Sequence, residues 1–128
     1  MPSPPLVPHA DTALTDAEPA ADAALIDAEH LARMTFGDRV LLREVLELFL
    51  RQSVDLMERL SASPADAAAT AHTLKGSALG VGAFSVAECA GRLEFAAENG
   101  RLPAVAFDEL KHTLAATIDV IRGLLRQP

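Results

Sequence analysis

The sequence has no tryptophan or tyrosine, and it has only five phenylalanines and one cysteine among 128 residues. A single cysteine cannot form an internal disulfide, which fits a reducing compartment, and we expect a cytoplasmic location. No apolar run reaches the length of about 18 residues that suggests a transmembrane helix, and the N-terminus lacks the features of a signal peptide. Aromatic residues are scarce, while Ala, Leu, Glu and Arg are abundant, so the composition predicts an all-α fold.

Basic residues are also few. The chain has 11 Lys and Arg against 18 Asp and Glu, a formal net charge of −7. A nucleic-acid-binding domain normally carries a basic patch, and docking on anionic lipid also needs positive charge. We therefore expect neither nucleic acid nor a membrane among the partners.

The negative charge is unevenly distributed. Residues 1–22 hold four acids, five prolines and no Lys or Arg. This segment is predicted to be a disordered acidic tail rich in proline and alanine. Residues 23–128 carry 14 acids and 11 bases, a net charge of only −3, and are expected to form one folded domain.

Capping residues divide the folded part into helices. Asp27 suits the N-cap of a short helix that reaches Met34, and Gly37-Asp38 separates it from a long helix over residues 39 to about 61. In that long helix, apolar residues fall within one sector of roughly 120°. Ser63-Pro64 has the pattern of a helix start. This next helix is predicted to run to about Val81, where the stretch Gly80-Val81-Gly82 ends it.

Two further helices follow. Ser85 to Glu88 has the pattern of a capping box, and Asn99-Gly100 that of a helix end. Pro103 is predicted to open the last helix. The short connections favour antiparallel neighbours. The sequence thus predicts an up-down four-helix bundle with a short additional N-terminal helix, and its complete core suggests a monomer.

His72 lies on the outer face of the third of these predicted helices. The inward stripe of this helix consists of Ala67, Ala71, Leu74, Ala78 and Val81, and His72 falls about 140° from its centre. An exposed histidine in mid-helix is most often an ordinary surface residue. Here, however, its neighbours one turn away are mostly small; they are Ala68, Ala69, Lys75, Gly76 and Leu79.

Gly76 and Lys75 make the surroundings of His72 unusual. A glycine inside a helix costs about 1 kcal/mol relative to alanine, and one justification is close access for another molecule. Lys75 would disfavour protonation of the imidazole and attract an anion. The sequence indicates no acid partner, oxyanion hole or cleft. A neutral, exposed imidazole in this setting suits group transfer better than hydrolysis.

The stretch from Ala71 to Ala78, AHTLKGSA, followed by LGVGA, closely resembles the signature of histidine-containing phosphotransfer (HPt) domains, here of the stand-alone bacterial type. The resemblance continues in Cys89 and in Arg92-Leu93-Glu94. Upstream, Leu25-Ile26-Asp27 and residues 46–50 resemble the first two helices of that family. The similarity therefore covers residues from about 24 to 126.

This resemblance implies a phosphorelay carrier. His72 would accept phosphate from the aspartyl phosphate of one response-regulator receiver domain and pass it to another receiver. A sensor histidine kinase of the hybrid type is the expected source. The chain would not be an enzyme with its own ATP site and would bind no cofactor, because the receiver supplies Mg²⁺.

The resemblance also assigns roles to the neighbours of His72. Lys75 would steady the phosphoryl group, and Gly76 would allow the receiver to approach. Ser77 would orient the site or simply pack, and Ala78 departs from the small polar residue that many members have. The expected partner-binding residues are Ala68, Ala69, Gly76 and Leu79. One flank of the long helix, with Leu41, Leu48, Leu50 and Val54, is a further docking candidate.

The sequence is compatible with three alternatives. A kinase dimerisation domain usually has an acid directly after its histidine, where this chain has Thr73. An adaptor could bind and regulate a receiver or kinase without being phosphorylated. Glu109-x-x-His112 has the spacing of a metal-binding bundle, but such a site needs two motifs of this kind, so no metal site is expected. Cys89 is predicted to be a small core residue.

Overall fold

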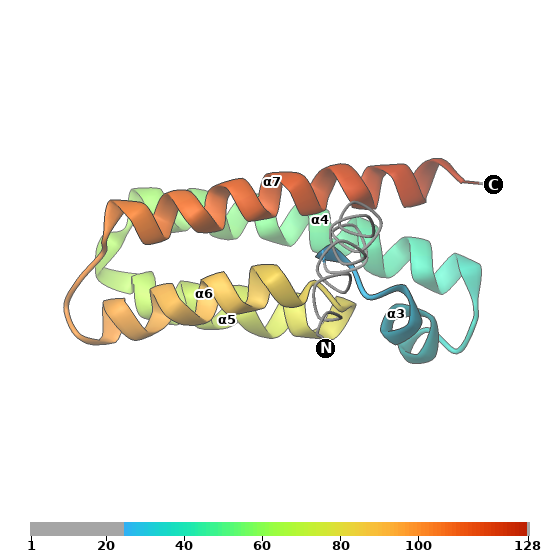
Figure 1. Cartoon of the computed structure of the whole chain (residues 1–128), viewed down its shortest axis with the longest axis horizontal. Helices are drawn as coiled ribbons and strands as arrows, with labels where there is room; N and C mark the ends of the chain where they lie inside the picture. Colours follow the sequence, from blue (N-terminus) through green and yellow to red (C-terminus); the bar gives the residue numbers. More distant parts are fainter. Residues whose placement is uncertain (1–24, 128) are drawn as a thin grey trace, which may run out of the picture.

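The structure is a computed structural model that describes residues 25–127, and within them it consists of helices and their connections, without a strand (Figure 1). The predicted tail, residues 1–22, lies outside the described residues. The helices are α3 (Ala28–Met34), α4 (Arg39–Ala62), α5 (Ala67–Val81), α6 (Phe84–Glu98) and α7 (Ala104–Arg126). The last four lie roughly side by side as the predicted all-α bundle, and α3 is the predicted additional helix.

The bundle pairs two long helices with two short ones. α4 and α7 have 24 and 23 residues, whereas α5 and α6 have 15 each. At 1.5 Å per residue the long pair spans about 36 Å and the short pair about 22 Å. The long helices therefore extend past the turn that joins α5 and α6, and α3 packs beside these extended parts of α4 and α7 (Figure 1). Leu31 of α3 is buried there.

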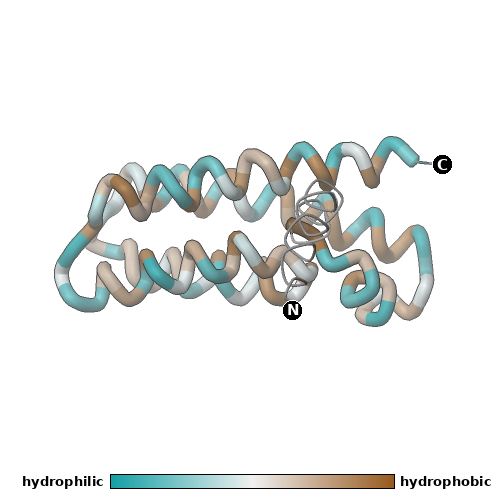
Figure 2. The backbone as a smooth tube through the Cα atoms, viewed as in Figure 1, coloured by the Kyte–Doolittle hydropathy of each residue, from teal (hydrophilic) through white to brown (hydrophobic). Residues whose placement is uncertain are grey.

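The core is built from the apolar stripes that the sequence predicts. Along each helix of Figure 2, hydrophobic and hydrophilic stretches alternate. Ser53 and Thr117 are the polar residues buried among the apolar side chains of α4 and α7, and each hydroxyl donates to a backbone carbonyl of its own helix. The largest fully buried apolar side chains are Phe49, Leu31, Leu46, Leu74, Leu93, Leu110 and Ile121.

The turn between α5 and α6 holds the start of α3 in place. Gly82 ends α5 in the left-handed conformation, with φ of 82°, as the sequence predicts. Its carbonyl accepts a hydrogen bond of 2.9 Å from the backbone N–H of Asp27. A Cβ at Gly82 would lie 3.1 Å from the carbonyl oxygen of Asp27, so glycine is needed there for its conformation and for space.

Two predicted helix starts differ from the structure. α6 begins at Phe84 with Ala83 as N-cap and no side-chain cap, so Ser85 is not the first residue of a capping box. The reason is that the sharp turn at Gly82 already directs the chain into the helix. Ser63 and Pro64 do mark a start, but of a 3₁₀ turn, η1 (Pro64–Asp66), and α5 itself begins at Ala67.

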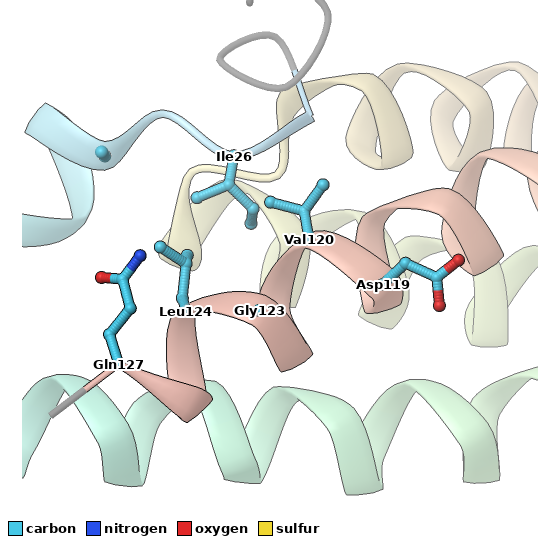
Figure 3. A pocket seen from close by; sticks show the side chains of 7 residues that line it. Ile26, Asp119, Val120, Gly123, Leu124 and Gln127 are labelled. Carbon is cyan, nitrogen blue, oxygen red and sulfur yellow. The ribbon is translucent and has the colours of Figure 1, made fainter.

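A groove of about 510 Å³ lies between the first described residues and the C-terminal part of α7. In Figure 3, Ile26 and the side chains of Val120 and Leu124 lie close to one another along it. Ile26 is buried, so this contact fixes the approach to α3 against α7. The groove is lined by none of the residues around His72.

Candidate functional site

His72 lies in the middle of α5 with its side chain 68% exposed. The predicted inward stripe of α5 is buried, which directs the histidine outward. Thr70 is buried as well, since it faces the side of α5 that packs on its neighbours. The periodicity of α5 therefore correctly predicts the orientation of His72.

Glu94 of α6 is the acid partner that the sequence did not reveal. Its Oε2 lies 2.8 Å from Nδ1 of His72, and its side chain is only 14% exposed. The expectation that His72 has no acid partner is therefore wrong. The two residues are 22 positions apart, and they meet because α6 returns antiparallel alongside α5. Glu94 directly follows the core residue Leu93, which places it at the edge of the helix contact.

The same carboxylate also holds Lys75. Nζ of Lys75 lies 3.1 Å from Oε1 of Glu94, so each carboxylate oxygen has one partner. The hydrogen bond from Lys75 holds the pKa of the Glu94 carboxyl below its usual range; the hydrogen bond from His72 acts in the same direction, and burial opposes both. Lys75 therefore does not act on His72 alone, because Glu94 balances its charge.

This arrangement selects one form of the imidazole. An ionised carboxylate only accepts hydrogen bonds, so Nδ1 of His72 carries the proton and donates a hydrogen bond to Oε2 of Glu94. In the neutral ring the lone pair then resides on Nε2. Because His72 is largely exposed, this nitrogen is accessible to an electrophile from outside.

The surface around His72 is open. Gly76 is exposed and helical, and a Cβ built there would meet no atom within 4 Å. No contact inside the described chain therefore requires glycine at this position. Ala69 is exposed, Ala68 is partly buried, and Leu79 is an exposed apolar residue with 45% of its surface accessible.

Gly91 of α6 is a further glycine of the site, one that the helix pattern of the sequence did not point to. A Cβ at this position would lie 3.3 Å from Cδ of Lys75, closer than ordinary packing. The missing side chain leaves room for the aliphatic part of Lys75 to lie across α6 on its way to Glu94. The signal in the sequence that indicates Gly91 is a glycine in the interior of a predicted helix.

Ser77 faces α4 rather than His72. Its hydroxyl lies 3.4 Å from Oε1 of Gln52, and the side chain is partly buried. Of the docking candidates on α4, Leu48 and Val54 are exposed. Val54 lines a groove shared with α7, so it lies on the other flank of α4 from Gln52.

The Glu109-x-x-His112 pattern does not form a metal site, since Glu109 is paired with an arginine. Glu109 forms an ion pair with Arg92, with 3.2 Å between Oε1 and Nη2. Within residues 25–127 no group of three or more His, Cys, Asp or Glu side chains is arranged to hold a metal ion. Cys89 is buried in the apolar cluster, as predicted.

None of the helices described is both long and apolar enough to cross a membrane.

His72 is thus an exposed histidine on a helical bundle, held by an acid from the neighbouring helix, and this arrangement suits a nucleophile in group transfer. The model of the Hpt domain family matches residues 44–120, which is more than half of the chain. The protein therefore belongs to the Hpt domain family, whose members carry phosphoryl groups on histidine in two-component phosphorelays and interact with receiver domains and histidine kinases. No curated protein and no solved structure matches the chain significantly.

Proposed function

We propose that His72 is the phosphoacceptor of a multistep phosphorelay. In this proposal it takes a phosphoryl group from the aspartate of one receiver domain and passes it to the aspartate of another. The observation that carries the proposal is the different setting of the two ring nitrogens. Nδ1 is hydrogen-bonded to Glu94, and Nε2 is left free at the surface. That is the arrangement a nucleophilic imidazole needs.

The transfer needs no added base, because the attacking nitrogen carries no proton. The Nε2 lone pair attacks phosphorus, an N–P bond forms, and the bond between phosphorus and the aspartyl oxygen breaks, its electron pair leaving with the carboxylate. The proton on Nδ1 stays in place, and the positive charge of the phosphorylated ring lies next to the Glu94 carboxylate. The reverse step delivers the group to a second receiver.

Other side chains would support this step. Lys75 would contact the phosphoryl oxygens and keep its ion pair with Glu94, in which Nζ lies 3.1 Å from Oε1. Mg²⁺ would be supplied by the receiver, and this chain would bind no cofactor of its own. Gly76, with Ala68, Ala69 and Leu79, would form the surface on which the receiver rests, and Ser77 would brace α5 against α4.

The first experiment is transfer from a radiolabelled phospho-receiver with Mg²⁺ to the wild-type protein and to His72→Gln. We expect label on the wild type alone, in an acid-labile and base-stable bond. Equal labelling of both proteins would overturn the assignment of His72. No transfer from a panel of receivers, with helicity intact, would instead favour an adaptor that binds without being phosphorylated.

We also propose that the protein is a cytoplasmic monomer. Sedimentation tests the oligomeric state, and cell fractionation tests the location.

A further inference from the structure

A polar recess of about 330 Å³ lies beside His72, where the end of α4 meets the start of α5. Ala69 and Thr73 line it, and in the sequence they stand three residues before and one residue after the histidine. The recess therefore opens on the α4 side of the phosphoacceptor, whereas Glu94 and Lys75 lie on the α6 side. Its complete lining is Arg59, Ser63, Asp66, Ala69, Thr70 and Thr73.

Arg59 gives this recess a cation without a partner. Among the described residues its guanidinium makes no hydrogen bond or ion pair, and the residue is exposed. Lys75 and Arg92, by contrast, are each tied to a carboxylate. Asp66 lines the same recess, but no ion pair joins it to Arg59, and its side chain caps no helix.

We propose that Arg59 binds a carboxylate side chain of the partner receiver in this recess and thereby helps to select the receiver. This inference rests on the proposed function. The charge of Lys75 is balanced by Glu94, so Arg59 remains available to an acidic partner. A guanidinium presents its N–H groups in a planar fork that matches a carboxylate, and the recess has room for an acidic side chain.

Because Arg59 and Asp66 carry opposite charges, substituting each should change receiver binding in opposite directions. Arg59→Gln removes the attraction for an acid, and Asp66→Asn removes a repulsion from it. The rate of phosphotransfer would be measured against the concentration of a phospho-receiver that labels the wild type. Arg122→Gln, which removes a charge from the exposed surface of α7, is the matched control.

We expect Arg59→Gln to raise the receiver concentration for half-maximal rate by about fivefold, the upper range for an exposed ion pair. Asp66→Asn should lower that concentration, and Arg122→Gln should leave it unchanged. The rate at saturating receiver should be the same in all four proteins, because His72, Lys75 and Glu94 are untouched. The effect of Arg59→Gln should fade at high salt.

Each other result overturns the inference. Reversed signs would show that the recess takes a cation of the partner through Asp66. Equal half-maximal concentrations for Arg59→Gln and the wild type would show that the recess is not part of the docking surface, while the proposed function would stand. If no receiver labelled the wild type, both proposals would fail together. Circular dichroism of each variant checks that the bundle is intact.

Discussion

Glu94 lies 2.8 Å from Nδ1 of His72 and 3.1 Å from Nζ of Lys75, so one carboxylate from α6 holds two side chains of α5. The carboxylate fixes the tautomer of the histidine and the position of the lysine at once. An exposed histidine would otherwise be free to rotate and to exchange tautomers. The short ion-paired cluster therefore converts a surface residue into an oriented one.

Glu94→Ala should slow phosphotransfer to His72 by about tenfold, which corresponds to about 1.4 kcal/mol of lost orientation. Glu94→Gln should retain more of the rate, because its amide oxygen still accepts the Nδ1 hydrogen bond, although it no longer pairs with Lys75. Single-turnover transfer from a phospho-receiver measures both. Glu88→Ala, on the exposed face of α6, is the control. Unchanged rates in both Glu94 variants would show that the ring needs no anchor.

Gly76→Ala should change stability and transfer in opposite directions. A Cβ meets no atom within 4 Å, and alanine favours a helix over glycine by about 1 kcal/mol, so the free energy of unfolding should rise by up to that amount. The same methyl group would stand where we propose that a receiver approaches, so transfer should become slower. Urea unfolding and transfer assays on one protein sample test both. Faster or equal transfer would remove the argument that Gly76 provides access.

The stability difference between wild type and Glu94→Gln should depend on pH. The pKa of Glu94 is lower in the folded protein than the ordinary value of 4.5, so its carboxylate stabilises the fold above that pH. This stabilisation should disappear as the pH falls through the lowered folded pKa. Thermal unfolding of both proteins between neutral pH and about pH 3 measures the difference. A difference that grew towards acid would contradict this linkage.

Gly82→Ala and Gly100→Ala form a matched pair. Both glycines have positive φ, 82° and 75°, so each substitution should cost about 1 to 2 kcal/mol of backbone strain. At Gly100 nothing lies within 4 Å, whereas at Gly82 a Cβ would press on the carbonyl of Asp27 at 3.1 Å. Gly82→Ala should therefore destabilise the protein more, as measured by urea unfolding. Equal losses would mean that the packing of α3 on the α5–α6 turn contributes little.

The sequence by itself determined the helices and the direction of His72. Apolar spacing, the Asp27 and Asp38 caps and the stop at Gly82 are local signals, and each depends on residues within a few turns of one another. The start of α6 was placed wrongly at Ser85, because its true start follows from the turn at Gly82 rather than from a side-chain cap.

Only the tertiary structure decided what surrounds His72. Glu94 and Gly91 come from α6, and they meet His72 and Lys75 only through the way α6 packs against α5. Arg59 of α4 likewise lies in one recess with Ala69 and Thr73 only through the packing of α4 against α5. Periodicity indicates which face of a helix is buried, but it does not give the rotation and register between two helices. Those quantities place a carboxylate 2.8 Å from a ring nitrogen 22 residues away, and they follow from side-chain packing in the assembled core.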